Sequence, residues 1–356
     1  MTTEIRNVVA PAETAPPIRF RDPQIEMAHG AGGKASRRLV EGLIAPIFGG
    51  GMLQPLADAA LLDVSAGRLA FTADSFVVKP LRFPGGSIGD LAVNGTLNDL
   101  AVSGAAPIAL LVTLILEAGL PTPVLEAELR AIAAAARRAG VAVVGGDTKV
   151  VEHGAADGMY ITTAGIGVLD SRVRLSSSAV KVGDQILLSG PIGDHGITIL
   201  LARGEIDLEA NLNSDTRCVR PMVDALIAAV GEGLHWMRDP TRGGVASALN
   251  ELAADARLSM MIHEDRLPVR DAVRGACELL GLEPLHIANE GQFLAVVAAE
   301  VADAALAAVR AAPGGEDAVL LGEVRAEPVR TVVSVSPYGS TRVVDMLVGD
   351  PLPRIC

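Results

Sequence analysis

Aromatic residues are scarce in this chain, at 3% of 356 residues with a single tryptophan. Proteins that bind single-stranded nucleic acids without sequence preference stack the bases on aromatic side chains, so this scarcity disfavours that class. Basic residues are also outnumbered, with 30 lysines and arginines against 42 aspartates and glutamates and a net charge of −12. Because a phosphate backbone attracts clustered basic residues, we expect no nucleic-acid partner.

Long apolar runs are missing as well. The longest, residues 108–116, contains one threonine, ends at Glu117 and is far too short to span a bilayer. The first 25 residues lack the apolar centre of a secretory signal, and the proline-rich stretch at 11–17 is typical of disorder. The sequence therefore predicts a cytoplasmic protein without a membrane segment, with a disordered extension over residues 1–25.

Cysteine is the third residue type in short supply. Cys218, Cys277 and Cys356 are too few, and odd in number, for a disulfide framework. This agrees with a reducing compartment, in which thiols stay free.

The last cysteine is also the last residue of the chain. Pro351 and Pro353 precede Cys356, and each fixes its own backbone and favours an extended conformation in the residue before it. A terminal cysteine alone is most often incidental, because chain ends fray. With the two prolines, however, we expect a semi-rigid, mobile tail over residues 346–356 that can carry a thiol into a site elsewhere.

The rest of the chain is rich in apolar residues. Hydrophobic residues make up 50% of it, enough for a large core and, at this length, for two domains. Short apolar runs typical of strands alternate with amphipathic runs typical of helices. Strands are expected at 69–72, 76–78, 108–116, 141–144, 159–168, 185–189, 235–237 and 293–298. Helices are expected at 88–104, 123–139 (with Thr122 as N-cap), 216–230, 243–256 and 301–311.

This alternation predicts an α/β (α+β) fold in two parts. A serine-rich stretch, residues 171–179, separates the two series of elements. We expect an N-terminal domain over residues 26–172 and a C-terminal α/β domain over residues 173–345, ahead of the tail.

Acidic residues recur after the expected strands or in glycine-rich turns. Four stand out: Asp58, Asp74, Asp99 and Asp147. A single aspartate at such a position most often caps a helix or a turn. Carboxylates at the carboxyl ends of strands can also converge on one crevice and bind a hard cation such as magnesium. Asp99 and its neighbour Asn98 are the weaker members, because they lie near a helix face that can simply be solvated.

Glycine-rich loops accompany these acids. Three segments qualify: His29–Lys34, Phe83–Gly86 and Thr241–Gly244. Glycine allows backbone N–H groups to approach phosphate oxygens closely. None of the loops matches the Walker A or dinucleotide-binding pattern, so a nucleotide site here is of another type.

Taken together, the motifs resemble those of one family, that of the hydrogenase maturation factor HypE. This family belongs to a superfamily that includes aminoimidazole ribonucleotide synthetase and selenophosphate synthetase. The resemblance runs from His29 to Cys356, and the terminal Pro-Leu-Pro-Arg-Ile-Cys separates this family from its relatives. The other motifs are His29-Gly-x-Gly-Gly33, Asp74-Ser-x-Val-Val78, Phe83–Gly86, Asn98-Asp99, Gly146–Val151, Gly193–Gly196, Thr241–Gly244 and Asn289–Gly291. Position 31 departs from the pattern, because alanine replaces the small hydroxyl residue of many members.

The resemblance implies a homodimer whose N-terminal domains pair into a shared β-barrel, with ATP and magnesium (Mg2+) near the domain junction. It implies an ATP-dependent carbamoyl dehydratase whose substrate is its own tail. The carbamoyltransferase HypF loads the terminal thiol, and ATP drives dehydration of the thiocarbamate to a thiocyanate. The cyano group then passes to iron on a HypC–HypD scaffold, for the nickel–iron hydrogenase.

The resemblance also implies roles for single residues. Cys356 carries the carbamoyl group, and Glu290 or His195 is the base that removes a proton from its nitrogen. Lys149 steadies the transferred phosphoryl group or the oxygen it attacks, and Arg354 holds the docked tail on an acidic wall. Expected magnesium ligands are Asp58, Asp74 and Asp147, and expected nucleotide contacts are Gly32, Gly33, Lys34, Asn98, Asp99 and Thr148.

Without the resemblance, simpler interpretations remain. Glu290 suits a turn, His195 a hydrogen-bonded loop and Arg354 a solubilising charge. Two other functions also stay open: a small-molecule ATP-dependent synthetase or kinase of the same superfamily, in which the tail is incidental, and a non-enzymatic acidic adaptor that docks a metallochaperone.

Overall fold

The computed structural model describes residues 19, 21, 33–39, 41–42, 60–64, 67–204, 210–349, 352 and 354–356. The predicted N-terminal extension lies almost wholly outside this set, as do Asp58, Gly32 and the side chain of Thr148. None of the helices in the described ranges is long and apolar enough to cross a membrane.

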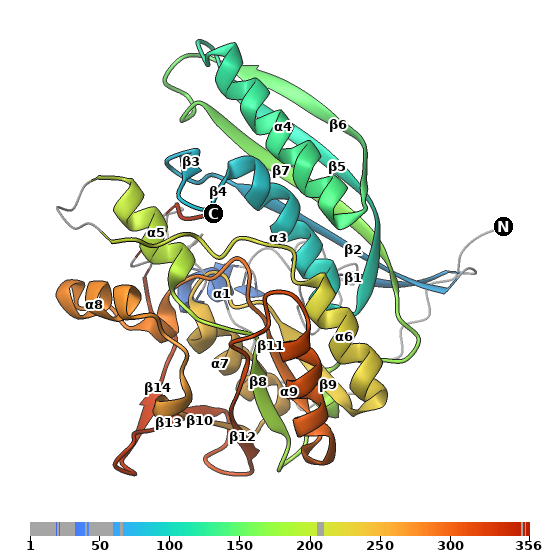
Figure 1. Ribbon diagram of the computed structural model, residues 1–356, viewed down its shortest axis with the longest axis vertical. Coiled ribbons are helices and arrows are strands. Elements are labelled where there is room, and N and C mark those ends of the chain that lie inside the picture. The colour runs from blue at the N-terminus through green and yellow to red at the C-terminus, as the bar shows by residue number, and fades with distance from the viewer. Residues whose placement is uncertain are drawn as a thin grey trace.

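The first domain is built on a five-stranded sheet with the order β1-β2-β7-β5-β6. The strands are β1 (Ala60–Val64), β2 (Gly67–Phe76), β5 (Ala105–Glu117), β6 (Ala142–Val151) and β7 (Met159–Leu169). Only β5 and β6 pair in parallel, joined by helix α4 (Thr122–Ala139). Helices α3 (Ile88–Val102) and α4 lie together on one face of the sheet (Figure 1).

Helix α3 is the centre of this domain and is buried along most of its length. It begins at Ser87, whose hydroxyl accepts from the backbone of Asp90 at 3.4 Å and so caps one unpaired N–H group. Gly95 faces the ring of Phe76, where an added Cβ would lie 2.9 Å from the ring. A glycine is therefore needed for β2 to approach the helix this closely.

The second domain is built on a seven-stranded sheet with the order β14-β13-β10-β12-β8-β11-β9. Its strands are β8 (Gln185–Leu188), β9 (Leu234–Arg238), β10 (Ser259–His263), β11 (Leu294–Val297), β12 (Val319–Arg325), β13 (Thr331–Val335) and β14 (Thr341–Val344). Alternate residues enter two cores: Leu187 packs beneath α6 (Arg220–Val230) and α9 (Ala302–Ala311), whereas Ile186 packs beneath α7 (Gly244–Ala256).

The remaining elements lie around the junction of the domains. They are α1 (Gly33–Leu39), the short hairpin β3 (Arg82–Phe83) and β4 (Gly86–Ser87), α5 (Asp194–Ala202) and α8 (Asp271–Leu280). Figure 1 shows the C-terminus between the β3–β4 hairpin and α5.

The two-domain mixed fold confirms the expected class, with several corrections. The segment Gly145–Val151, expected as a turn after a short strand, belongs to β6. The runs at 69–72 and 76–78 are not two strands, because β2 covers the first run, continues without a break and ends at Phe76. Helix α4 begins one residue early, with Pro121 rather than Thr122 as N-cap, and α6 begins at Arg220 instead of 216. The sequence analysis missed α1, β1, β3, β4, α5, β10, α8 and β12–β14.

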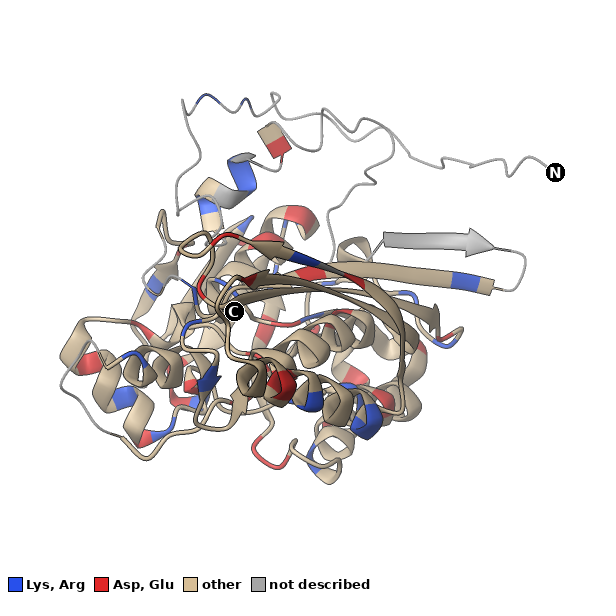
Figure 2. Ribbon diagram, turned by 90° about the horizontal axis from the view of Figure 1, so that it is seen from above, with Lys and Arg blue, Asp and Glu red and all other residues tan. Residues whose placement is uncertain are grey.

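The face of the first sheet opposite α3 and α4 is apolar and exposed. Phe71, Leu111, Val144 and Val168 point to it, and it holds a hollow of about 560 Å³. The strands of this sheet carry few charges (Figure 2). Within the described strands the sheet is open, with β1 and β6 at its edges.

Candidate functional site

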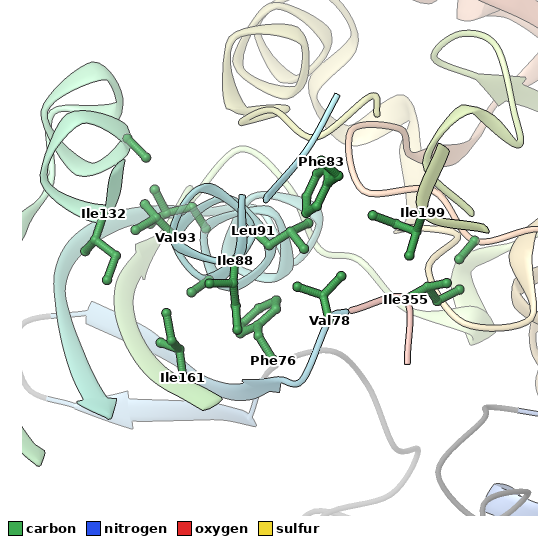
Figure 3. Packing of buried hydrophobic residues seen from close by; sticks show 14 of the residues in the cluster. Phe76, Val78, Phe83, Ile88, Leu91, Val93, Ile132, Ile161, Ile199 and Ile355 are labelled. Carbon is green, nitrogen blue, oxygen red and sulfur yellow. The ribbon is translucent and has the colours of Figure 1, made fainter. Parts of the chain in front are cut away.

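The chain terminus is docked between the two domains. Leu352 and Ile355 are only 3% and 5% exposed, and Cys356 is half-buried. Ile355 packs with Val78 from the first domain and Ile199 from the second (Figure 3). The tail therefore completes an apolar cluster that both domains share.

Main-chain hydrogen bonds hold the tail in register. The N–H of Val77 donates to the carbonyl oxygen of Cys356 at 3.1 Å, and that of Lys79 donates to Arg354 at 3.4 Å. These pairs follow an antiparallel alignment, so the tail lies like a short extra strand beside the residues that follow β2. Arg203 bridges the two segments, because its Nη2 donates to the Arg354 carbonyl at 2.7 Å and its Nε to the Lys79 carbonyl at 3.1 Å.

Arg354 also anchors the tail through its side chain. Its guanidinium forms an ion pair with Asp157, which lies between β6 and β7. Asp157 also accepts from Lys79 at 3.3 Å and from the Tyr160 hydroxyl at 3.1 Å. The hydrogen bond from Arg354 is the main reason that the pKa of the Asp157 carboxyl lies below its usual range. Arg354 was predicted to hold the tail on an acidic wall, and Asp157 supplies a carboxylate at that position.

His195 contacts the tail from the first turn of α5. The ring is fully buried, with Nε2 2.7 Å from the carbonyl oxygen of Ile355 and Nδ1 2.7 Å from the hydroxyl of Ser214. Burial lowers the pKa of His195 to about 4, although the hydrogen bond to Ile355 acts in the opposite direction. The ring is therefore neutral at neutral pH, and because a carbonyl can only accept, Nε2 carries the proton.

This geometry gives His195 a different task from the predicted one. With the tail docked, both ring nitrogens are engaged, and His195 donates to the tail backbone. Phe83 stacks against the ring edge-on, with the centroids 5.8 Å apart, and helps to fix it. That His195 acts as a base stays a prediction, and it requires a position of the tail that leaves a ring nitrogen available.

Glu290 is a buried carboxyl close to the charges of Asp74 and Arg242. It is 3% exposed and lies in the turn before β11. Burial raises its pKa well above the usual range, and the nearby charges of Asp74, Asp239 and Asp215 add to this, whereas Arg242 opposes it. The neutral form is thus favoured, and a carboxyl of raised pKa is suited to proton transfer near neutral pH.

The turn that carries Glu290 is held by two side chains. The N–H of Glu290 donates to Oδ1 of Asp215 at 3.0 Å, and its carbonyl accepts from the amide of Asn98 at 2.9 Å. Asn98 also donates to the carbonyl of Arg217 at 2.9 Å and accepts from the N–H of Val219 at 2.8 Å. At 1% exposed, Asn98 therefore ties two loops together, and its role as a nucleotide contact stays a prediction.

Asp74 lies near the end of β2 and faces α3. Burial raises the pKa of its carboxyl, and Arg242, with Nη2 4.0 Å from Oδ1, offsets part of the rise. Next to Arg242, a Cβ on Gly243 would lie 4.0 Å from the backbone nitrogen of Gly33. Two of the predicted glycine-rich loops therefore meet close to Asp74, in accord with the charge coupling to Glu290.

Asp147 and Lys149 are not brought to this place within one chain. The strand register aligns Asp147 with Ser75, on the open face of the sheet, whereas Asp74 faces the helices. The Asp147 and Lys149 side chains are 57% and 68% exposed and pair with each other at 2.7 Å. Strands β2 and β6 run in the same direction, but Asp74 and Asp147 point to opposite faces of the sheet, so a single chain does not gather these two acids in one crevice.

The other predicted nucleotide contacts have local partners. Lys34 pairs with Asp345 at 2.5 Å, at the start of the short helix α1. Asp99 accepts from the hydroxyl of Thr72 at 2.7 Å. Among the described residues, no group of three His, Cys, Asp or Glu side chains is arranged to hold a metal ion.

Four residues of this region escaped the sequence analysis: Asp157, Arg203, Ser214 and Asp215. The last two belong to the polar run Asn213–Thr216, which is typical of a turn and was partly assigned to a helix. Arg203 acts through main-chain contacts, for which the sequence carries no signal.

Two family models match this chain, one in each domain. The family model "AIR synthase related protein, N-terminal domain" matches residues 56–169, and "AIR synthase related protein, C-terminal domain" matches residues 181–334. The chain is 48% identical over 339 residues to the carbamoyl dehydratase HypE of Azotobacter vinelandii, covering 95% of this chain and 99% of that protein.

Solved structures agree. A chain in the crystal structure of a HypE–HypF complex matches with a TM-score of 0.82 and 40% identity, over 87% of this chain and 99% of that one. The crystal structure of the hydrogenase maturation protein HypE in complex with ATP matches with a TM-score of 0.78 and 43% identity, over 93% and 99%.

Proposed function

Because the chain belongs to the HypE family of carbamoyl dehydratases, involved in hydrogenase maturation, we propose that it uses ATP to dehydrate its own S-carbamoylated Cys356 to a thiocyanate. The observation that carries this proposal is the docked tail. Main-chain bonds to Val77 and Lys79 fix the position of the terminal residue between the two domains, beside the segment that follows Asp74. This docking supports a role for Cys356 as the substrate.

The chemistry needs activation of a poor leaving group. Transfer of the γ-phosphoryl group of ATP to the carbonyl oxygen of the thiocarbamate releases ADP and one proton from nitrogen. Expulsion of phosphate with the second N–H proton then leaves the S–C≡N group. The net change is loss of one water and conversion of ATP to ADP and phosphate. Phosphoryl transfer depends chiefly on positioning and charge, whereas the nitrogen protons need a base.

Glu290 is the residue best suited to take a proton from nitrogen. Its burial and the surrounding carboxylates make the protonated form favourable, so it accepts a proton readily once ionised. His195 has the opposite tendency, because burial keeps its ring neutral, and its bond to Ile355 makes it a holder of the tail. We therefore assign the base role to Glu290.

ATP use implies a magnesium ion, and Asp74 fits it. Mg2+ is ordinarily held by one or two carboxylates together with the nucleotide phosphates, and not by a cage of protein side chains. The carboxyl of Asp74 is half-buried with a raised pKa, so a cation there would stabilise its charged form. When bound, the ion would neutralise phosphate charge during transfer.

Loading and delivery require other proteins. We infer that a HypF-type carbamoyltransferase loads Cys356 and that a HypC–HypD scaffold accepts the cyano group for the iron of the hydrogenase. Because the docked Cys356 is half-buried, the tail has to leave its place to reach either partner. Its mobility is thus a requirement of the proposed function.

A second copy of the chain completes the proposal. The open apolar face of the first sheet suits pairing into a homodimer, and it carries Asp147 and Lys149. These two residues join the site only if a second copy packs there.

The dimer predicts a clear result for Leu111→Glu. A charge in the middle of the apolar face opposes its burial, so we expect the dimeric wild-type mass in light scattering to fall to that of a monomer. Leu279→Glu, on the exposed outer surface of α8, is the matched control and is expected to stay dimeric. A dimeric Leu111→Glu variant would argue against this surface.

The dehydratase itself is tested by intact mass spectrometry. The purified chain is incubated with HypF, carbamoyl phosphate and magnesium ATP, and the C-terminal peptide is then analysed. We expect a carbamoyl adduct that loses one water only when ATP is present. An unmodified tail with ATP turnover would point instead to a small-molecule synthetase, and an unmodified tail without turnover to an adaptor.

A further inference from the structure

Ser214 stands behind His195, on the side away from the tail. Its hydroxyl is 2.7 Å from Nδ1, and it is 8% exposed. The hydroxyl oxygen also accepts the N–H of Thr216 at 3.1 Å. Because Nε2 donates to the carbonyl of Ile355, Nδ1 of the neutral ring is bare, and the hydroxyl directs its single hydrogen to it.

The tautomer of His195 follows from this arrangement. By donating to the bare Nδ1, Ser214 stabilises the tautomer that carries the ring proton on Nε2, where the proton meets the carbonyl oxygen of Ile355. The other tautomer would place a bare nitrogen against a carbonyl oxygen, and both atoms would be acceptors. The state of a buried ring thus decides whether the tail is held or repelled.

The Ser214 backbone is fixed from one side by the Phe83–Gly86 loop. Its N–H donates to the carbonyl of Pro84 at 2.9 Å, and a Cβ on Gly85 would lie 2.8 Å from its carbonyl oxygen. From the other side, a Cβ on Gly291 would lie 1.9 Å from the carbonyl oxygen of Asp215. Gly85 and Gly291 therefore allow the Ser214–Asp215 segment to pack closely between the Phe83–Gly86 loop and the turn that carries Glu290.

We propose that Ser214 is a positioning residue for the substrate tail, because it holds His195 as the Nε2–H tautomer that donates to Ile355. This deepens the proposed function, since it concerns how Cys356 is presented. It does not depend on that function, because docking is measurable without ATP or carbamoyl phosphate.

Thiol protection in the full chain tests the proposal. Each variant is treated with iodoacetamide without nucleotide, and alkylation of Cys356 is followed by peptide mass spectrometry. We expect Ser214→Ala to raise the alkylation rate of Cys356 about fivefold to tenfold, the effect of losing one buried hydrogen bond. Ser340→Ala, which removes an exposed hydroxyl in a distant turn, is expected to match the wild type.

Two further variants separate positioning from general damage. Ser214→Thr keeps the hydroxyl and is expected to restore protection of Cys356. His195→Gln keeps an N–H donor for Ile355 but has no tautomers, so adding Ser214→Ala to it should have no further effect on the rate. Cys277, which is 2% exposed, reports unfolding, and it should stay unreactive throughout.

The tautomer can be observed directly by nitrogen NMR of labelled His195. We expect the proton on Nε2 in the wild-type protein and a mixture of tautomers in Ser214→Ala. An unchanged tautomer together with unchanged protection of Cys356 would overturn the proposal. The proposal would also fail if Ser214→Ala raised the alkylation rate of Cys356 as much in the His195→Gln background as in the wild type, because the serine would then act other than through the ring. If Ser214→Ala exposes Cys277, the same comparison of backgrounds decides the case.

Discussion

Cys356→Ala is expected to abolish both the carbamoyl adduct and the subsequent loss of water, to below detection. The reason is that no other thiol can replace the one on the tail. Cys277 is buried, with a pKa raised to about 11 mainly by burial, and burial likewise raises the pKa of Cys218. A thiol with a raised pKa presents little thiolate, which is the nucleophilic form. The measurement is intact mass and C-terminal peptide analysis with HypF, carbamoyl phosphate and magnesium ATP.

The matched control for this variant is Cys218→Ala. It removes a half-buried thiol from the segment ahead of α6 and is expected to leave the modification of the tail unchanged. Binding of ATP should survive in both variants, because neither sulfur lies among the groups assigned to the nucleotide. A carbamoyl adduct that persists in Cys356→Ala would show that another residue is the acceptor, and the tail would lose its role as substrate.

The sequence points to the proposed substrate residue, Cys356, more clearly than to the residues that surround it. A terminal cysteine behind two prolines is visible in the chain itself. The place where it docks is not, because Val77 and Lys79 donate to the tail through their main-chain N–H groups, and the Arg203 guanidinium donates to a main-chain carbonyl of the tail. The main-chain contacts of Val77 and Lys79 place little demand on side-chain identity, so no motif marks them.

Glycine and asparagine are the residues whose type is hardest to interpret from the sequence. Gly146 suggested a turn, but a Cβ there would lie 1.7 Å from the carbonyl oxygen of Val112, so the glycine serves close contact between two paired strands. Asn98 is predicted to contact the nucleotide, which stays a prediction, and the fold shows a structural role in which its amide bonds to three main-chain groups. In both cases the residue type indicates a special environment, and only the fold decides whether that environment is structural.

Glu290→Gln is expected to slow ATP-dependent loss of water from the carbamoylated tail by about 10²- to 10⁴-fold, the usual contribution of a positioned general base. Glutamine has nearly the same shape and can remain in the buried site, but it cannot accept the proton. The rate is measured by mass spectrometry on tails loaded beforehand, so that loading by HypF does not limit it. Glu300→Gln, on an exposed turn, is the control and is expected to keep the wild-type rate.

Glu290→Gln is also expected to change how stability depends on pH, and the direction of this change follows from the raised pKa of Glu290. Between the ordinary pKa of glutamate and the higher value in the folded protein, the folded chain holds a proton at Glu290 that the unfolded chain has released. The free energy of unfolding therefore falls as pH rises through this window, and it is fully retained only below the ordinary pKa. Glu290→Gln removes this contribution, so its stability should decline less steeply with pH in denaturant unfolding.

The ionisation of Glu290 should also appear in the activity, which is expected to rise with pH. Glu290 acts as a base only when ionised, so the rate of water loss is expected to rise with pH through the raised pKa, while the stability falls. Burial is the largest cause of the raised pKa, the charges of Asp74, Asp239 and Asp215 add to it, and Arg242 opposes it. Removing the opposing cation with Arg242→Gln should raise the pKa further and move the rising limb to higher pH. A profile that is flat across this range, or a Glu290→Gln variant with the wild-type rate, would exclude Glu290 as the base.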